Sequence, residues 1–142
     1  MIGFMTSLCT LWLLFIYLKI AVGKDKEYMI DYNRDLVIAK AKQCFPNEDQ
    51  EKIMGILDLY HGPEKERVQI AILKLSGGDL EDLRTEVETA KRDYRDVLAY
   101  AEFPEEMNQW ALSDKEEVSE EEEKRMRERD RQQYIDWLQR RV

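Results

Sequence analysis

The chain has 142 residues with 22 basic and 30 acidic side chains, and its formal net charge of −8 at pH 7 disfavours nucleic acid and anionic lipid as partners. Charged residues make up 37% of the sequence beside only three prolines and six glycines, which predicts that much of the charge lies on helices. One histidine and two cysteines do not provide a disulfide framework and are not typical of a metal protein.

The opening stretch, residues 1–23, is apolar and contains a single charged residue, Lys19. A helix of this length spans roughly 34 Å, which is about the hydrocarbon thickness of a bilayer. Lys19, Lys24 and Lys26 follow the run and no basic residue precedes it. The positive-inside tendency therefore predicts a single-pass membrane anchor inserted through residues 2–23, with the helical domain in the cytoplasm.

Two other interpretations of this stretch stay open. The small residues at 21–23 are of the kind that a signal peptidase requires, although the basic segment that normally opens an export signal is absent. Alternatively, translation begins at Met29, so that residues 1–28 are not part of the protein and the protein is cytoplasmic.

Residues 28–112 show helical periodicity in successive segments and predict a compact bundle of about four helices. The first segment runs from about Tyr28 to Phe45, where Pro46 ends it. Asn47 then predicts the N-cap of a second helix, with Gln50 completing a capping box, and this helix ends before Gly62.

The third segment begins at Pro63 and is apolar on several sides, which predicts the most buried helix of the bundle. After the turn "SGGD", Asp79 caps a fourth helix that Pro104 ends. Apolar residues recur in this helix every three or four positions, at Leu80, Leu83, Val87, Ala90, Tyr94, Val97 and Ala101. We expect the short segment 105–112, with Trp110 and Leu112, to fold back and cover one end of the bundle.

Residues 113–142 predict a long charged helix capped by Ser113. Acidic residues come first and basic residues later, as the helix dipole favours. Two ion pairs are expected four residues apart, Glu121 with Arg125 and Glu123 with Arg127. No strand-like alternation of useful length is present, so the fold class is all-α, in three parts: 1–23, 28–112 and 113–142.

Each candidate for chemistry has a simpler structural explanation. His61 lies at the end of a helix without an acid, nucleophile or metal ligand beside it, and Cys44 ends an apolar stripe as a small buried residue. "SGGD" lacks the lysine of a phosphate-binding loop, and the acids of "SEEEEK" point in different directions around a helix. The sequence therefore indicates no cofactor, no metal and no small-molecule substrate.

Two surfaces are the predicted sites of interaction with a protein partner. One is the polar face of the fourth helix, and the other is the apolar end of the tail, which docks on helices within the chain or on a partner. The residues chosen are Arg92, Arg95 and Asp96 on the first surface, and Tyr134, Trp137 and Leu138 on the second.

The stretch "ERVQIAILKLSGGDLEDLRTEVETAKRDYRDVLAYAEFPEE", residues 66–106, resembles small uncharacterised helical proteins of bacteria. In those proteins a "VQLAILKL" helix, a Gly-Asp turn and a "DYRDVLAxAE" helix occur in the same order. The resemblance implies a short soluble protein, which favours Met29 as the start. It implies no activity, cofactor or functional residue.

The expected function is that of a non-catalytic protein-interaction module, either cytoplasmic or tethered to the inner face of a membrane. One alternative is an enzyme that acts through Glu86, Asp93 and Asp96, which requires a pocket holding carboxylates with displaced pKa values. The other is a self-associating structural protein. Met126 is the one apolar residue between Glu120 and Gln133, too few for a good coiled-coil seam.

Overall fold

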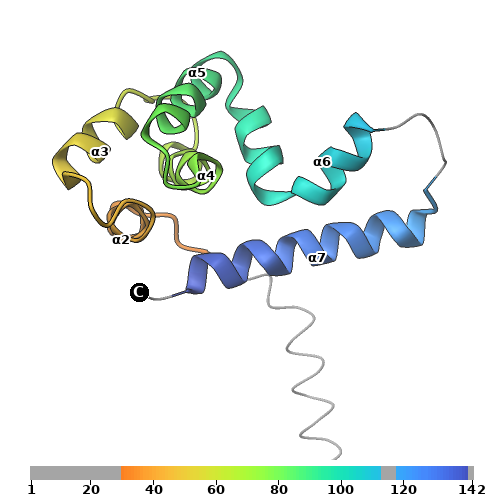
Figure 1. Cartoon of the computed structure of the whole chain (residues 1–142). Helices are drawn as coiled ribbons and strands as arrows, with labels where there is room; N and C mark the ends of the chain where they lie inside the picture. The colour runs from red at the N-terminus through yellow and green to blue at the C-terminus, as the bar shows by residue number, and fades with distance from the viewer. Residues whose placement is uncertain (1–29, 113–117, 141–142) are drawn as a thin grey trace, which may run out of the picture. The chain divides into compact units, whose positions relative to one another are not determined.

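The computed structural model describes residues 30–112 and 118–140, which form six helices and no strand (Figure 1). The predicted all-α class is confirmed. From Tyr32 onward the chain makes one compact unit, which includes the tail helix. The segment 2–23 and the alternative start at Met29 lie outside the described residues. Within the described ranges, no helix is both long enough and apolar enough to cross a membrane.

The first two helices begin later than predicted. Helix α2 (Arg34–Cys44) begins only after Asn33, whose side chain accepts a hydrogen bond from the backbone N–H of Leu36 at 2.9 Å. Helix α3 (Gln50–Leu57) is capped by Asp49 and not by Asn47. For α3 the reason is that Asn47 and Asp49 are both good capping residues, and sequence alone does not choose between them.

Helix α4 (Lys65–Ser76) buries seven of its twelve residues, which confirms the prediction that it is the most buried helix. It starts two residues later than predicted, because Glu64 at its N-cap adopts a left-handed conformation with φ of 51°. At the other end, Gly77 and Gly78 have φ of 57° and 80° and make a plain turn between helices, as predicted.

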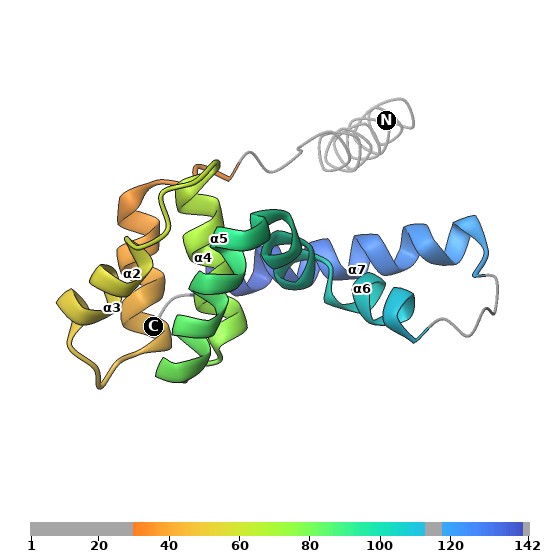
Figure 2. The same ribbon diagram turned by 90° about the horizontal axis from the view of Figure 1, so that it is seen from above.

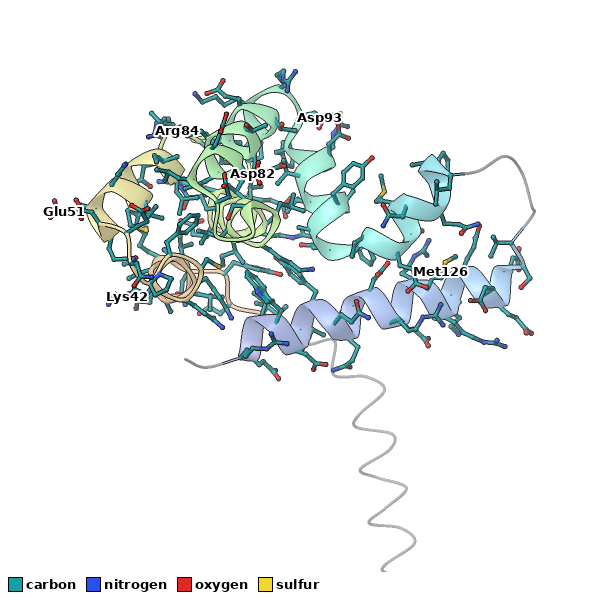
Figure 3. The ribbon with its side chains drawn as sticks, viewed as in Figure 1. Lys42, Glu51, Asp82, Arg84, Asp93 and Met126 are labelled. Carbon is teal, nitrogen blue, oxygen red and sulfur yellow. The ribbon has the colours of Figure 1, made fainter. Side chains whose placement is uncertain are left out.

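Helix α5 (Leu80–Glu102) starts at the predicted cap, where Asp79 accepts from the backbone N–H of Asp82 at 2.9 Å. It is not the continuous helix that the periodicity predicted. At Asp93 the backbone leaves the helical region, with φ of −153° and ψ of 98°. Figure 1 shows the change of direction, and Figure 3 labels Asp93 beside it. We call this break the α5 kink.

Helices α4 and α5 form the main contact of the fold, with α2 packed on α4 and α3 packed on α2 and α5. Burial of aliphatic side chains at these contacts is the main favourable term for folding. Fully buried members of the core come from all four helices: Val37, Ile53, Leu57, Ile70, Ile72, Leu73 and Leu83.

Helix α6 (Pro104–Ala111) lies against α7 (Glu120–Gln139), and the two run in opposite directions (Figures 1 and 2). The expectation that this segment covers an end of the bundle is wrong, since no residue of α6 is buried. Trp110 and Leu112 are 74% and 80% exposed. Met126, labelled in Figure 3, is instead a buried apolar residue of α7 on the side that faces α6.

Ion pairs attach α6 to α7. Arg127 binds Glu106 at 2.7 Å, and Arg129 binds Glu105 at 2.8 Å. The expected ion pair of Arg127 with Glu123 is not among the salt bridges of the described residues, because the guanidinium contacts Glu106 on the neighbouring helix; the hydrogen bond to Glu106, and then the charge of Glu123, still raises the pKa of Arg127. The expected pair of Glu121 with Arg125 is present at 3.7 Å.

The start of α7 also differs from the prediction. Ser119 caps it by accepting a hydrogen bond from the backbone N–H of Glu122 at 3.2 Å, whereas Ser113 lies outside the described residues.

Three charged side chains, each from a different helix, satisfy the end of another helix. Asp130 of α7 is fully buried and accepts hydrogen bonds from the backbone N–H groups of Glu105 and Glu106, at 3.1 and 3.0 Å. At helix C-termini, Lys74 donates to the carbonyl oxygen of Ala101 at 2.7 Å, and Lys40 donates to that of Trp137. These contacts place negative charge at a helix N-terminus and positive charge at C-termini, as the helix dipole favours.

Candidate functional site

The three tail residues chosen from sequence are packed within the chain. Tyr134 and Leu138 are 3% and 8% exposed, and Trp137 is half-buried. The rings of Tyr134 and Trp137 stack at a centroid distance of 5.8 Å, and the Lys40 ammonium lies 4.6 Å from the centre of the Trp137 ring. Of the two docking modes expected for the tail, this structure shows the one within the chain.

The hydroxyl of Tyr134 is buried without a hydrogen-bond partner among the described residues. A buried polar group of this kind loses its water contacts and gains nothing in return. We therefore expect Tyr134→Phe to leave the free energy of unfolding unchanged or to raise it by up to about 1 kcal/mol. Urea unfolding followed by far-UV circular dichroism measures the difference. A loss of more than that amount would show that the hydroxyl has a partner.

The buried tyrosines also predict a loss of stability at high pH. Burial, and then the charge of Glu102, raises the pKa of Tyr32 to about 12; burial raises the pKa of Tyr134 as well. The folded state thus keeps these protons above the ordinary tyrosine pKa of about 10, where the unfolded state releases them. The stabilisation is complete below pH 10; for Tyr32 it is lost as the pH rises from there to about 12, and for Tyr134 the loss continues at higher pH.

Two lysines have the opposite effect at lower pH, where they make the stability of the protein rise with pH. Burial lowers the pKa of Lys40 and of Lys74, so their contribution to stability rises with pH until it levels off near the ordinary lysine pKa of about 10.4. We expect urea midpoints to fall steeply above that pH, and to fall less steeply for Tyr134→Phe. Identical pH slopes for the two proteins would contradict this assignment.

The other predicted surface, on α5, coincides with the kink. The carboxylate of Asp93 accepts hydrogen bonds from the backbone N–H of Arg95 at 3.0 Å and from the Arg95 guanidinium at 3.1 and 3.3 Å. Asp93 thus acts as an internal N-cap for the second half of α5. These hydrogen bonds lower the pKa of Asp93.

A pocket of about 530 Å³ lies between the α5 kink and the loop that joins α3 to α4. We call it the kink pocket. Its lining comes from two segments of five and six residues: Leu59, Tyr60, His61, Gly62, Pro63, and Ala90, Lys91, Arg92, Asp93, Tyr94, Arg95. Of the three α5 residues chosen from sequence, Arg92 and Arg95 line it, whereas Asp96 is exposed outside it.

The loop wall of the kink pocket is held by its own contacts. Tyr60 is 2% exposed, and its hydroxyl donates to the carbonyl oxygen of Pro63 at 2.7 Å. A Cβ atom at Gly62 would come within 2.6 Å of that hydroxyl, so the loop closes over the tyrosine only with glycine at this position. Leu59, in contrast, is 53% exposed at the edge of the pocket.

The charge of the kink pocket differs in sign from that of the whole chain. Lys91, Arg92 and Arg95 line it together with one acid, Asp93, which is bound to Arg95. Lys91 pairs with Glu88 at 3.0 Å. Arg92 is exposed and has no ion-pair partner in the part of the chain that the structure describes. The pocket is therefore a basic and partly apolar surface on an acidic protein.

The acids of the enzyme alternative are not brought together. Burial, and then the charge of Asp82, raises the pKa of Glu86, but neither Glu86 nor Asp96 lines the kink pocket with Asp93. Across residues 30–112 and 118–140, no three side chains of the metal-binding types gather into a possible metal site.

Two single residues lie elsewhere than predicted. His61 is not at a helix end: α3 ends at Leu57, and His61 is exposed on the loop wall of the kink pocket. Cys44 is half-buried and not fully buried, and burial raises the pKa of its thiol, which disfavours the reactive thiolate.

Sequence reasoning missed the kink because no glycine or proline marks it. A weak signal was present, since Asp93 is a good capping residue and another acid, Asp96, follows it three positions later, near the start of the second half of α5. The uninterrupted apolar periodicity concealed that signal. No family model, no curated protein and no solved structure matches this chain.

Proposed function

We propose that the chain is a non-catalytic interaction module that binds a protein partner through the kink pocket. The observation that carries the proposal is this preformed, basic and partly apolar pocket on an acidic chain. Of the two surfaces chosen from sequence, the tail is buried within the chain, which leaves the α5 surface accessible. Exposed arginine beside apolar and aromatic side chains is a common composition of protein-binding surfaces.

A photo-crosslinking amino acid placed at His61, which is exposed on the loop wall of the pocket, tests the proposal in the cells that make the protein. Arg84 is the control, since it is exposed on α5, where Figure 3 labels it, and is not among the residues that line the pocket. We expect a discrete crosslinked protein band from position 61, absent from position 84 and lost when Arg92 is changed to glutamate. Equal or absent crosslinking at both positions would refute a partner at this pocket.

The compartment in which the partner is bound depends on the N-terminal segment. If residues 2–23 form an anchor, the kink pocket meets its partner at the cytoplasmic face of a membrane; if translation starts at Met29, it meets the partner in the cytoplasm. The intact mass of the native protein, measured separately in membrane and soluble fractions, distinguishes these two cases from export with cleavage before Lys24.

A further inference from the structure

We infer that the partner segment of the kink pocket is an acidic peptide with one large apolar side chain. The inference rests on the function proposed above and names the chemistry of the partner. Charge is the first argument. Arg92 has no carboxylate partner among the described residues, so a ligand carboxylate gains a charge-assisted hydrogen bond there without displacing an existing one.

The apolar part of the pocket supplies the second argument. Leu59 is half-exposed at the pocket edge, and Tyr94 is half-buried in its lining. A leucine or phenylalanine of the ligand would cover both and would remove apolar surface from water. Acidic residues on either side of that anchor then reach the arginines at the rim.

Preorganisation is the third argument. The loop wall is fixed by Tyr60 and Gly62, and the helix wall by the hydrogen bonds that Asp93 accepts from Arg95. A peptide therefore binds without ordering either wall, which reduces the entropic cost of association.

The net charge of −8 repels an acidic ligand only at long range. At physiological ionic strength charges are screened beyond about 8 Å, whereas contacts at the pocket are not. We therefore expect the acidic chain to slow association more than it weakens the complex.

The test is a titration of the isotopically labelled full chain with defined probes, followed by NMR. The first probe is a nine-residue glutamate peptide with a central phenylalanine. The comparison probes are the same peptide with lysine for glutamate, the same peptide with glycine for phenylalanine, and inorganic phosphate. We expect the first peptide to shift the amide signals of residues 59–62 and 91–95, and the glycine peptide to bind more weakly.

Matched variants locate the binding. Arg92→Glu is expected to weaken the acidic peptide about fivefold or more, since an attraction becomes a repulsion, while Arg84→Glu leaves it unchanged. Both residues are exposed, so neither change disturbs the core. Equal loss in both variants would show general attraction to positive charge and would overturn the inference.

Other outcomes overturn it in distinguishable ways. Binding of the lysine peptide at the pocket, or of no peptide while position 61 still crosslinks a partner, refutes the acidic ligand and leaves the proposed function intact. The same shifts with phosphate alone would assign the pocket to a small anion. Shifts that grow with protein concentration in the absence of a probe would assign it to a second copy of the chain.

Discussion

Glu102→Gln is expected to lower the free energy of unfolding by about 2–3 kcal/mol, because it breaks a largely buried ion pair. Glu102 on α5 receives two hydrogen bonds from the Arg67 guanidinium, from Nε to Oε1 and from Nη2 to Oε2, both at 2.7 Å. Glutamine keeps the shape but presents an NH₂ group to one of these donors. The cost is at the low end for such pairs, because the Arg67 side chain is 33% exposed and also binds Glu64 at 2.8 Å.

Chemical denaturation of Glu102→Gln beside Glu88→Gln separates this effect from a general loss of negative charge. Glu88 forms an exposed pair with Lys91, with side-chain exposures of 63% and 40%, so its replacement is expected to cost less than about 0.5 kcal/mol. Glu102→Gln also lowers the pKa of Tyr32, since the charge of Glu102 is the second cause that raises it. Equal stability of the two variants would mean that the Arg67–Glu102 pair contributes nothing in solution.

Asp130→Ala is expected to destabilise the protein by about 2 kcal/mol, through the loss of a helix cap supplied from a distance. No side chain of α6 caps its own N-terminus, because the N-cap position is Phe103. The buried carboxylate of Asp130 accepts the N–H groups of Glu105 and Glu106 instead. With alanine these two donors lose their partner, and the contact between α6 and α7 weakens.

Residue-resolved hydrogen exchange of Asp130→Ala shows which helices are destabilised. We expect faster exchange in α6 and in the first half of α7, with little change in α4. Asp136→Ala on the exposed side of α7 is the control, since the Asp136 carboxylate accepts a hydrogen bond from Gln132 on the same helix. Uniform acceleration through all helices would show that Asp130 supports the whole fold and not only α6.

The fold class could be predicted from sequence because helical periodicity and capping residues are local signals. The cap at Asp79 and the burial of α4 follow directly from residues within one or two turns. The predicted start of a helix was wrong where two good capping residues lie close together, as with Asn47 and Asp49, since the choice between them depends on tertiary packing.

The features that organise the candidate site were not predictable in the same way. Asp130 meets residues 24 and 25 positions earlier in the chain, and Lys40 meets a carbonyl group 97 positions later. No local pattern encodes such distances. The α5 surface was chosen for its charges, and the tail surface for its apolar residues. The pocket beside the α5 surface depends on the α5 kink, and the burial of the tail depends on its docking against the other helices. Only the structure shows these two features.

The cap at the start of α6 has a consequence for how the protein is made. Residues 104–111 leave the ribosome well before Asp130 does. During synthesis the backbone N–H groups at the start of α6 therefore lack the Asp130 carboxylate as acceptor until α7 has emerged. An isolated helix of eight residues is marginal in water, and we expect α6 to form only after the tail docks. Chains truncated before residue 130 and released from the ribosome would thus expose this segment to proteases, whereas complete chains would protect it.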